Sequence, residues 1–296
     1  MKKKILVGFG ELGQGLFDVF SRYHRILIHD PLKGYLNGDK VDKINLLLVA
    51  IPFSEDFVKI VREYQERFKP DATVIFSTVP VGTTKQIPFA VHSPVEAPHP
   101  IMAQYIGRAC RFVGGDFNQD VCDFFEFAGL EVRWIEKADF TEFLKLRSTT
   151  VYGLAIEFAR YSAEVAEKIG MPYDVISEYD REYNHINRIN GRQDFQRYVI
   201  RKPEGKIGGH CVLPNAKLLV NQFYHPFLDT ILEINGEKWK EVSCIDCKKA
   251  LDVIGGIVPN ARNVFNLYTR ASGYICDECS KRARELKAQS QKDKEV

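Results

Sequence analysis

Apolar residues along the first half of the chain follow a pattern typical of alternating strands and helices. Strands are predicted where short apolar runs occur, at residues 5–7, 26–28, 44–51, 73–76 and 89–91. Residues 12–20 and 55–68 instead place their apolar side chains at helical spacing. Because consecutive parallel strands need a helical crossover, this alternation predicts an α/β fold with a doubly wound parallel sheet.

A long helix is predicted further along the chain, starting near Asp139. Asp139 and Glu142 have the spacing of a capping box, with Asp139 as the N-cap residue. Apolar residues then recur at steps of three or four and form one mostly apolar face: Phe143, Leu146, Thr150, Leu154, Phe158, Tyr161, Val165 and Ile169. Gly170 and Pro172 end the helix, which has roughly 30 residues and so exceeds the usual globular length. Residues 179–198 have no clean periodicity, and no element is predicted there.

The turn after the first strand carries a glycine pattern. Gly8, Gly10 and Gly13 have the G-x-G-x-x-G spacing between a predicted strand and a predicted helix. In a dinucleotide-binding loop the first glycine permits the tight turn, the second lets the backbone approach a pyrophosphate, and the third allows close helix packing. The N-terminus of the helix attracts the phosphates. Asp30 ends the next strand about 20 residues on, where a carboxylate binds ribose hydroxyls and favours NAD over NADP.

These features predict an NAD site, because the strand, helix, second strand and acid all occur in register. The alternative is an ordinary βα turn that needs its glycines for packing alone. Pro52 ends the 44–51 strand where the carboxyl edge of the sheet would face the cofactor. The expected cofactor contacts from this part of the chain are Gly8, Phe9, Gly10, Glu11, Leu12, Gly13, Asp30 and Pro52.

Length, charge and the lengths of the apolar runs exclude several classes of protein. The 296 residues allow two modest domains or one large one. Lys plus Arg number 41 and Asp plus Glu number 39, so a net charge of +2 gives no general attraction to nucleic acid or membranes. The longest apolar run, 44–51, is too short to span a bilayer, and the apolar stretch after Lys2, Lys3 and Lys4 is too short for a signal peptide. A cytoplasmic protein with no membrane or nucleic-acid partner is therefore expected.

Four of the seven cysteines form two C-x-x-C pairs near the C-terminus. Two such knuckles predict a tetrahedral zinc site with four thiolate ligands: Cys244, Cys247, Cys276 and Cys279. A closed four-cysteine site is structural, so no catalytic role is expected for the metal. Redox pairs are the alternative, but neither pair lies in a thioredoxin-like βαβ context.

Three further stretches resemble the UDP-glucose/GDP-mannose dehydrogenase family. They are the loop STVPVGTT at residues 77–84, the helix segment LKLRSTT around Lys145, and KPEGKIGGHCVLPN at residues 202–215. The GGHC string within the last stretch most resembles the branch that acts on UDP-N-acetyl-mannosamine-type sugars. The resemblance covers about residues 3 to 235. It implies a Rossmann domain whose last strands lie at residues 111–115 and 130–135, followed by a central helix on which two copies form a homodimer.

The resemblance also implies roles for individual residues. Thr78 would lie beside the cofactor and hold a catalytic water, and Lys145 would stabilise oxyanions. Cys211 would capture the aldehyde of a sugar nucleotide as a thiohemiacetal, which is oxidised to a thioester and hydrolysed after two hydride transfers to NAD. From the sequence alone, a helix that starts near Leu213 would lower the pKa of the Cys211 thiol. The alternatives are a small residue at a tight turn for Cys211 and a solvated charge for Lys145.

Several positions depart from the pattern of that family. Val95 replaces a glutamate, with Glu96 and His99 as candidate substitutes, Thr149 replaces an asparagine and Asn215 replaces an aspartate. Asn215 cannot act as a base. Thr149 and Asn215 are nevertheless expected at the catalytic site. The family continues into a second Rossmann-like domain that binds the nucleotide, whereas about 60 residues follow the region of resemblance here, too few for such a domain.

Together these patterns predict four parts of the chain. They are an NAD-binding Rossmann domain (1–137), a helical dimerisation and catalytic-loop domain (138–235), a zinc module (236–288) and a disordered tail (289–296). The expected function is oxidation of a sugar-nucleotide-like primary alcohol through Cys211. Two alternatives stay open: a one-step 3-hydroxyacid-type dehydrogenase that needs only Lys145, and a non-catalytic NAD-binding protein whose zinc module recruits a partner.

Overall fold

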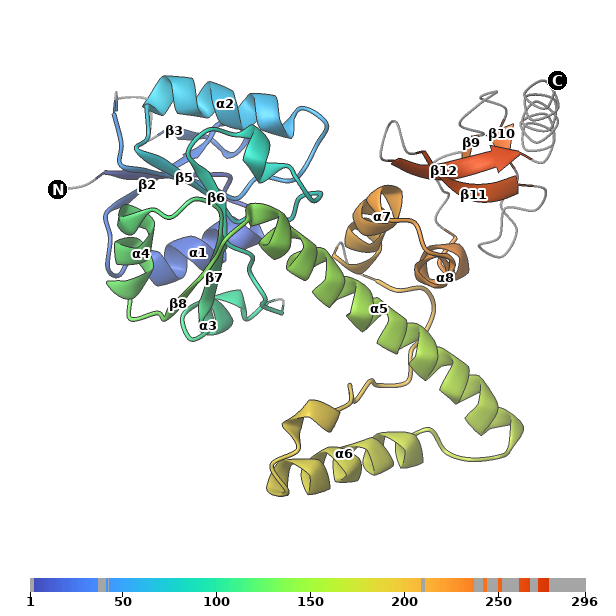
Figure 1. Cartoon of the computed structure of the whole chain (residues 1–296). Helices are drawn as coiled ribbons and strands as arrows, with labels where there is room; N and C mark the ends of the chain where they lie inside the picture. The colour runs from blue at the N-terminus through green and yellow to red at the C-terminus, as the bar shows by residue number, and fades with distance from the viewer. Residues whose placement is uncertain are drawn as a thin grey trace, which may run out of the picture. The chain divides into compact units, whose positions relative to one another are not determined.

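The computed structural model describes residues 3–36, 41, 43–98, 100–208 and 211–236, and the backbone of four short strands nearer the C-terminus (Figure 1). The chain divides into two compact units, Met1–Thr149 and Thr150–Val296, which we call unit 1 and unit 2. The four-part division predicted from the sequence stays a prediction. Within the described residues, no helix combines the length and the apolar character needed to cross a membrane.

Unit 1 is built on an eight-stranded sheet with the order β3-β2-β1-β4-β5-β6-β7-β8. Its strands are β1 (Lys4–Val7), β2 (Ile26–Asp30), β3 (Tyr35–Leu36), β4 (Leu46–Val49), β5 (Ala72–Ile75), β6 (Ala90–His92), β7 (Arg111–Gly114) and β8 (Val132–Ile135). β1 pairs in parallel with both β2 and β4, so the order of the strands reverses beside β1. The predicted α/β fold with a doubly wound parallel sheet is confirmed.

Two antiparallel pairings interrupt the parallel order. The short strand β3 runs antiparallel to β2 at one edge of the sheet. Near the other edge, β7 runs antiparallel to β6, and the pairing rests on one residue pair, His92 opposite Gly114. β7 then pairs in parallel with β8 over four residues. The sheet therefore has a narrow seam between β6 and β7.

Helices cover both faces of this sheet (Figure 1). They are α1 (Glu11–Phe20), α2 (Phe57–Phe68), α3 (Met102–Ile106) and α4 (Gln119–Glu126). The pleat sends alternate residues of β1 to opposite faces. Leu6 joins a core cluster with residues of α1, α3 and α4 such as Leu16, whereas Ile5 and Val7 join a second cluster with residues of α2. Burial on both faces explains why these strands are apolar throughout.

The long helix α5 (Ala138–Lys168) has 31 residues and crosses the division between the two units. It begins at Ala138, so Asp139 lies inside the helix and the capping box predicted at Asp139 and Glu142 is wrong. Glu142 instead accepts hydrogen bonds from a loop of unit 1, as described below. A further helix, α6 (Asp174–Ile189), overlaps the segment in which no element was predicted. Its apolar residues do recur at helical spacing, but of its side chains only Ser177 is buried.

In unit 2, α7 (Val212–Gln222) and α8 (Pro226–Ile234) pack against the second half of α5. A Cβ atom added to Gly153 would lie 2.7 Å from a methyl group of Val212, so glycine is required for this approach. Ile207, Val212 and Ile231 form the buried cluster at this contact.

Two antiparallel strand pairs follow further along the chain. β9 (Val242–Ser243) pairs with β10 (Ala250–Leu251), and β11 (Ala261–Asn266) pairs with β12 (Ala271–Cys276). Of the predicted zinc ligands, Cys244, Cys247 and Cys279 lie outside the described residues. Cys276 is described only as the last backbone position of β12.

Candidate functional site

The glycine loop connects β1 to α1 at the carboxyl edge of the sheet. Gly8 has a φ of +86°, and a Cβ atom there would lie 2.6 Å from the Ala50 carbonyl oxygen. A Cβ atom on Gly13 would collide with the carbonyl oxygen of Gly8. Gly10 differs from both, because its φ is −72° and an added Cβ would meet no atom within 4 Å. Conformation and packing therefore require Gly8 and Gly13, whereas Gly10 lies beside open space at the N-terminus of α1.

Asp30 ends β2 beside this loop. The Phe9 N–H donates to Asp30 Oδ2 at 2.8 Å, and Lys33 Nζ donates to the Phe9 carbonyl oxygen at 2.8 Å. The Phe9 ring makes edge contacts with Phe17 and Tyr35, at centroid distances of 5.7 and 4.8 Å. The structure thus brings the predicted acid to the glycine loop and holds it there through the backbone of the loop.

The other predicted cofactor contacts lie around the same edge. Glu11 is exposed in the first turn of α1, and Leu12 packs partly against the core. Pro52 is exposed in the segment that follows β4, the strand next to β1. Thr78 is half-buried three residues after β5, between the buried residues Ser77 and Val79.

Glu142 holds the loop that carries Thr78. Its side chain is buried, and its two carboxylate oxygens accept N–H groups from Gly82 at 2.6 Å and Thr84 at 2.7 Å. Burial raises the pKa of Glu142, and the bonds from Thr84 and Gly82 act in the opposite direction. Near the surface, Lys85 Nζ donates to Asp139 Oδ2 at 2.9 Å. The first turn of α5 therefore fixes residues 82–85.

His92 connects three elements beneath the loop. Its Nε2 lies 3.3 Å from the Ser77 carbonyl oxygen and its Nδ1 lies 2.9 Å from Thr141 Oγ1. A carbonyl can only accept, so Nε2 carries the proton and Nδ1 accepts the Thr141 hydroxyl. Complete burial lowers the pKa of His92 to about 3, and the positive charges of Lys145 and Arg111 act in the same direction. The imidazole is therefore neutral at pH 7.

Lys145 projects from α5 toward the segment after β6. Its Nζ donates to the Val95 carbonyl oxygen at 2.7 Å and lies 3.5 Å from Glu96 Oε2. Ser148 Oγ donates to the same Glu96 oxygen at 3.2 Å. The Lys145 side chain is only 14% exposed, whereas that of Glu96 is 52% exposed. The interpretation of Lys145 as an ordinary solvated helix lysine does not fit this environment.

The substituted positions have clear structural uses. Val95 packs its side chain into the core, so only its backbone oxygen faces Lys145. Thr149 Oγ1 donates back to its own helix, to the carbonyl oxygens of Lys145 and Leu146. Glu96, one of the two candidate substitutes, forms the ion pair with Lys145. His99 lies outside the described residues.

Arg111 supports the segment that holds Lys145. It is 2% exposed, and its Nη2 donates to Ser93 Oγ at 3.0 Å and to the Pro94 carbonyl oxygen at 2.8 Å. Burial lowers the pKa of Arg111 to about 10, so the guanidinium stays charged at neutral pH. Its charge lies over the rings of Phe76 and Phe125, at 5.9 and 5.6 Å from the centroids.

Sequence reasoning missed the parts played by Glu142, His92 and Arg111. The available signal was a polar residue at one end of a short apolar strand, as with His92 at the end of β6 and Arg111 at the start of β7. The spacing between Asp139 and Glu142 predicted a contact within the helix, so it gave no sign that Glu142 binds a distant loop.

Cys211 and Asn215 belong to unit 2. Cys211 is the N-cap residue of α7, one place before the first helical residue Val212, close to the predicted start near Leu213. Its carbonyl oxygen accepts the Asn215 N–H at 3.1 Å. Cys211 is partly exposed and Asn215 is buried. The thiol therefore lies beside the positive end of the α7 dipole.

A buried polar network fixes the chain before Cys211. The Asn235 side chain accepts the Ile207 N–H at 2.7 Å and donates to Glu157 Oε1 at 2.9 Å. Arg160 Nε donates to Glu157 Oε2 at 2.9 Å, and its Nη1 donates to the Gly205 carbonyl oxygen. Residues 205–207 are thus bound to α5 and to Asn235, the residue that follows α8.

Metal ligands cannot be assigned within this geometry. In the part of the chain that the structure describes, no group of three or more His, Cys, Asp or Glu side chains is arranged to hold a metal ion. All four predicted zinc ligands have side chains outside that part.

The fold is of the Rossmann type, with a doubly wound sheet followed by a long helix. No protein-family model matches the sequence, and no curated protein matches it either. Solved structures do match. UDP-D-ManNAc dehydrogenase from Pyrococcus horikoshii is 16% identical with a TM-score of 0.63, and the match covers 79% of this chain and 68% of that one.

Two further structures lead to the same conclusion. The 3-hydroxyisobutyrate dehydrogenase of Mycobacterium tuberculosis, determined with L-serine, is 14% identical with a TM-score of 0.60, and the match covers 80% of this chain and 93% of that one. The UDP-N-acetyl-mannosamine dehydrogenase Cap5O from Staphylococcus aureus is 15% identical with a TM-score of 0.56, over 79% and 68% of the two chains. At these identities the likeness shows the fold that this chain shares with them.

Proposed function

We propose that this protein is an NAD-dependent dehydrogenase that oxidises a hydroxyl group. The observation that carries the proposal is Gly10, which neither its φ nor its packing requires and which lies beside open space at a helix N-terminus. Neither the conformation nor the packing of the protein explains why position 10 is glycine. A glycine is expected at such a position where a pyrophosphate approaches the backbone. Asp30, held on the Phe9 N–H, is the acid expected for the adenosine ribose.

Lys145 is the proposed group at the reacting oxygen. The Val95 carbonyl and the Glu96 carboxylate fix its ammonium group, which can then stabilise negative charge on an alkoxide. Thr78 would position a water molecule or the substrate on the loop that Glu142 holds in place. NAD, when bound, supplies the acceptor for the hydride that the alcohol carbon loses.

The first candidate reaction is the four-electron oxidation of a sugar-nucleotide-like primary alcohol. Loss of a first hydride from the alcohol carbon gives an aldehyde, and the Cys211 thiolate adds to the aldehyde carbon. Lys145 then stabilises the negative charge on the oxygen of the resulting thiohemiacetal. Loss of a second hydride gives a thioester, and water displaces the thiolate to leave a carboxylate. The position of Cys211 at the N-terminus of α7 supports this proposal, because a helix N-terminus favours thiolate. Asn215 and Thr149 would bind substrate rather than act as bases.

The second candidate is a one-step oxidation of a hydroxyacid that uses Lys145 alone. It is supported by the buried side chain of Val95, which leaves no acid at that position to assist thioester hydrolysis.

The test of the chemistry is NADH formation by the full chain with a panel of nucleotide sugars and hydroxyacids. Two NADH per substrate, lost in Cys211→Ser and in Lys145→Ala, is the result expected for the first candidate. One NADH per substrate, lost only in Lys145→Ala, would establish the second. NAD binding without any turnover would contradict both and favour the non-catalytic NAD-binding protein.

The test of the cofactor site compares two glycines of the same loop. Gly10→Val should leave the free energy of unfolding almost unchanged and weaken NAD binding by about tenfold or more, because its side chain would occupy the open space. Gly13→Ala should destabilise the fold itself, because its Cβ would collide with the Gly8 carbonyl. Equal NAD affinity in wild type and Gly10→Val would refute the proposed site.

Two further features are proposed for the assembled protein. A homodimer is supported by the exposed apolar side chains of α5 and α6. A structural zinc ion bound by Cys244, Cys247, Cys276 and Cys279 is supported by the flanking strands. Cys244 directly follows β9, and Cys276 ends β12, so each C-x-x-C pair begins at the end of an antiparallel strand. That arrangement is typical of zinc knuckles and ribbons.

A further inference from the structure

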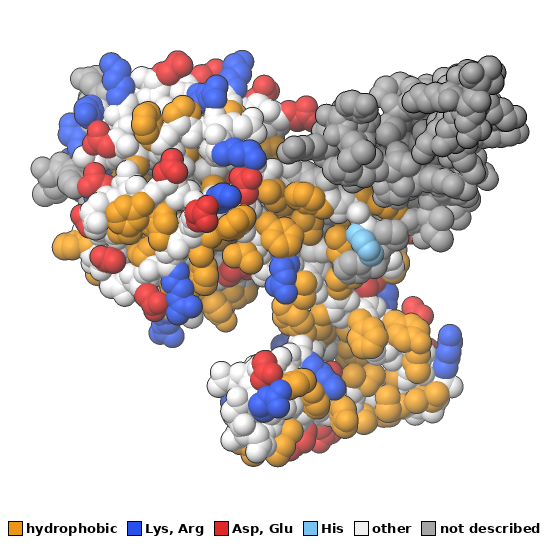
Figure 2. All heavy atoms as spheres, viewed as in Figure 1, with side chains coloured by type: hydrophobic (Ala, Val, Ile, Leu, Met, Phe, Trp, Pro, Cys, Tyr) orange, Lys and Arg blue, Asp and Glu red, His pale blue; other side chains and the backbone are white. Residues whose placement is uncertain are grey.

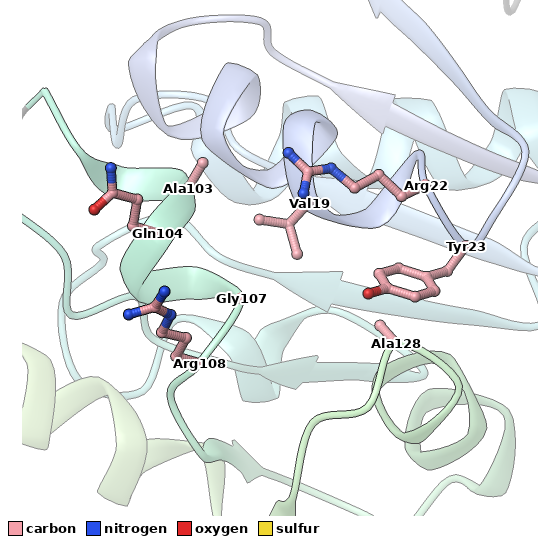
Figure 3. Close-up of a pocket in the computed structure, with 8 residues that line it drawn as sticks. All are labelled: Val19, Arg22, Tyr23, Ala103, Gln104, Gly107, Arg108 and Ala128. Atoms are coloured by element: carbon pink, nitrogen blue, oxygen red, sulfur yellow. The ribbon is translucent and has the colours of Figure 1, made fainter.

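A pocket of about 240 Å³ opens between α1, α3 and the turn after α4 (Figure 3). Its apolar lining comes from Val19, Ala103 and Ala128, which are buried or half-buried. The walls are close-packed, because a Cβ atom added to Gly15 of α1 would lie 3.1 Å from Met102 Cβ and 3.2 Å from Ile106 Cδ1 of α3. The pocket is thus a formed hollow between two helices in tight contact.

Four polar side chains surround the apolar lining. Arg22 and Tyr23 follow α1, Gln104 lies on α3 and Arg108 follows α3 (Figure 3). Throughout the described residues, these side chains make no hydrogen bond or ion pair, whereas other cations of unit 1, such as Lys85 and Arg133, are paired with acids. No acidic residue lines the pocket. Two guanidinium groups therefore face one hollow without a counter-charge.

Helix capping does not account for both arginines. Basic side chains are favourable near helix C-termini, and both arginines follow such an end. However, backbone N–H groups already satisfy the terminal carbonyls: Ser21 donates to Phe17, His24 donates to Phe20, and Gly107 donates to Ala103. The guanidinium N–H groups are therefore not needed to satisfy carbonyl groups at the helix ends. Both arginines line the same pocket, where one ligand could accept hydrogen bonds from both.

We propose that this pocket binds a small phosphomonoester with a flat or apolar body. Two guanidinium groups match the charge of −1.5 to −2 that such a phosphate carries near pH 7, and their planar forks bind its oxygens in pairs. The Tyr23 ring and the lining of Val19, Ala103 and Ala128 fit the organic body. The volume admits a molecule smaller than a typical drug-sized ligand.

The pocket lies between helices that lead to the glycine loop and to the segment that holds Lys145, so a ligand bound there could affect both parts of the proposed active site. α1 carries the glycine loop at its other end, ten residues or about 15 Å away. α3 follows the segment 93–96 whose backbone and carboxylate hold Lys145. A ligand that contacts both helices is therefore expected to change NAD affinity, and NAD to change its affinity by the same factor. This coupling rests on the proposed function, whereas the binding does not.

Calorimetry on the full chain tests the binding, with phenyl phosphate and inorganic phosphate as probes and uncharged phenol as a control. Saturable binding of phenyl phosphate, weakened about tenfold or more by Arg22→Ala and by Arg108→Ala, is expected. Arg181→Ala removes an exposed, unpaired arginine of α6 and should change nothing. Binding that is absent, or that is equal in wild type and both pocket variants, would overturn the proposal.

The glycine loop is a competing phosphate site and must be separated from the pocket. Gly10→Asp places a carboxylate in that loop, so binding at the pocket should persist in this variant while NAD binding is lost. Phenyl phosphate binding that disappears in Gly10→Asp but survives in Arg22→Ala would assign the phosphate to the loop and overturn the proposal. Should wild type bind phenyl phosphate at the pocket but not NAD, the pocket would stand and the proposed function would fail.

Discussion

His92 is a neutral imidazole enclosed where β6 ends, and its two nitrogens connect the Thr78 loop to α5. Protonation would place a charge in a site without solvent and would destroy the acceptor for the Thr141 hydroxyl. The unit-1 sheet therefore contains a group whose titration opposes folding.

Acid should destabilise the protein through this residue. The folded-state pKa of about 3 lies below the ordinary 6.5, so the unfolded chain binds more protons between these values. The stability contributed by His92 is complete above about pH 6.5 and falls as the pH falls, by about 2 kcal/mol at pH 5. Urea unfolding at pH 7 and pH 5 measures this loss. It should shrink in His92→Gln and persist in His185→Gln, a change at an exposed position of α6. An equal loss in all three proteins would exclude His92 as the source.

Glu142 and Asp139 offer a matched pair on one helix turn. Glu142→Ala removes the acceptor of two buried N–H groups, so the free energy of unfolding should fall by about 2–5 kcal/mol. Asp139→Ala breaks only the exposed pair with Lys85 and should have little effect. Denaturant titration of both variants checks the contrast. Similar stabilities would mean that the loop at residues 82–84 keeps its conformation without Glu142.

At the scale of elements, α5 and α6 expose much apolar surface. Figure 2 shows apolar side chains spread over these helices. The most exposed of them are Phe158, Tyr161, Ile169, Tyr179 and Ile189. Contiguous apolar surface of this kind marks a protein interface, and a second copy of the chain is the partner that we propose.

A charge on this surface should therefore prevent dimer formation. Phe158→Glu is expected to yield the mass of a monomer in sedimentation equilibrium, because a carboxylate cannot be buried there without a partner. Glu167→Lys changes an exposed residue on the opposite side of α5 and should leave the dimer intact. A monomeric wild-type protein would refute the proposed dimer outright.

The elements differ in how well the sequence predicted them, for physical reasons. The sheet strands and α1 were predictable, because local apolar periodicity and glycine spacing specify them. α6 was missed although its apolar residues recur at helical spacing, because charged and polar residues stand between them and its apolar face stays exposed in the folded chain. The strand β7 was expected, but its antiparallel direction was missed, because strand direction depends on pairings distant in the chain. In the candidate site, Asp30 followed from the spacing of a short motif, Lys145 followed from the family resemblance, and the helix after Cys211 was expected to start near Leu213, one residue after its observed start. The contacts of Glu142, His92 and Arg111 span 15 to 60 residues, and spacing along the chain cannot show them.

At the scale of the whole molecule, the proposed zinc site gives a direct test of the C-terminal region. The purified protein should contain about one zinc ion per chain, bound by four thiolates. Cys244→Ser and Cys279→Ser should each lower the metal content sharply. Cys110→Ser and Cys122→Ser, at two of the free cysteines of unit 1, should leave it unchanged. Elemental analysis after dialysis provides the measurement, and a metal-free wild-type protein would contradict the site.

The seam between β6 and β7 sets where unit 1 opens first. One residue pair joins these strands, whereas β1, β4 and β5 are joined over four residues each. Opening at the seam breaks few backbone hydrogen bonds, and it is opposed by Arg111, by His92 and by the apolar core that continues across the seam. We therefore expect the amide hydrogens of β7 and β8 to exchange with solvent through a local fluctuation, and those of β1 and β4 to exchange only through global unfolding. Such a difference in exchange would place the segment that holds Lys145 at the border between two parts of unequal stability.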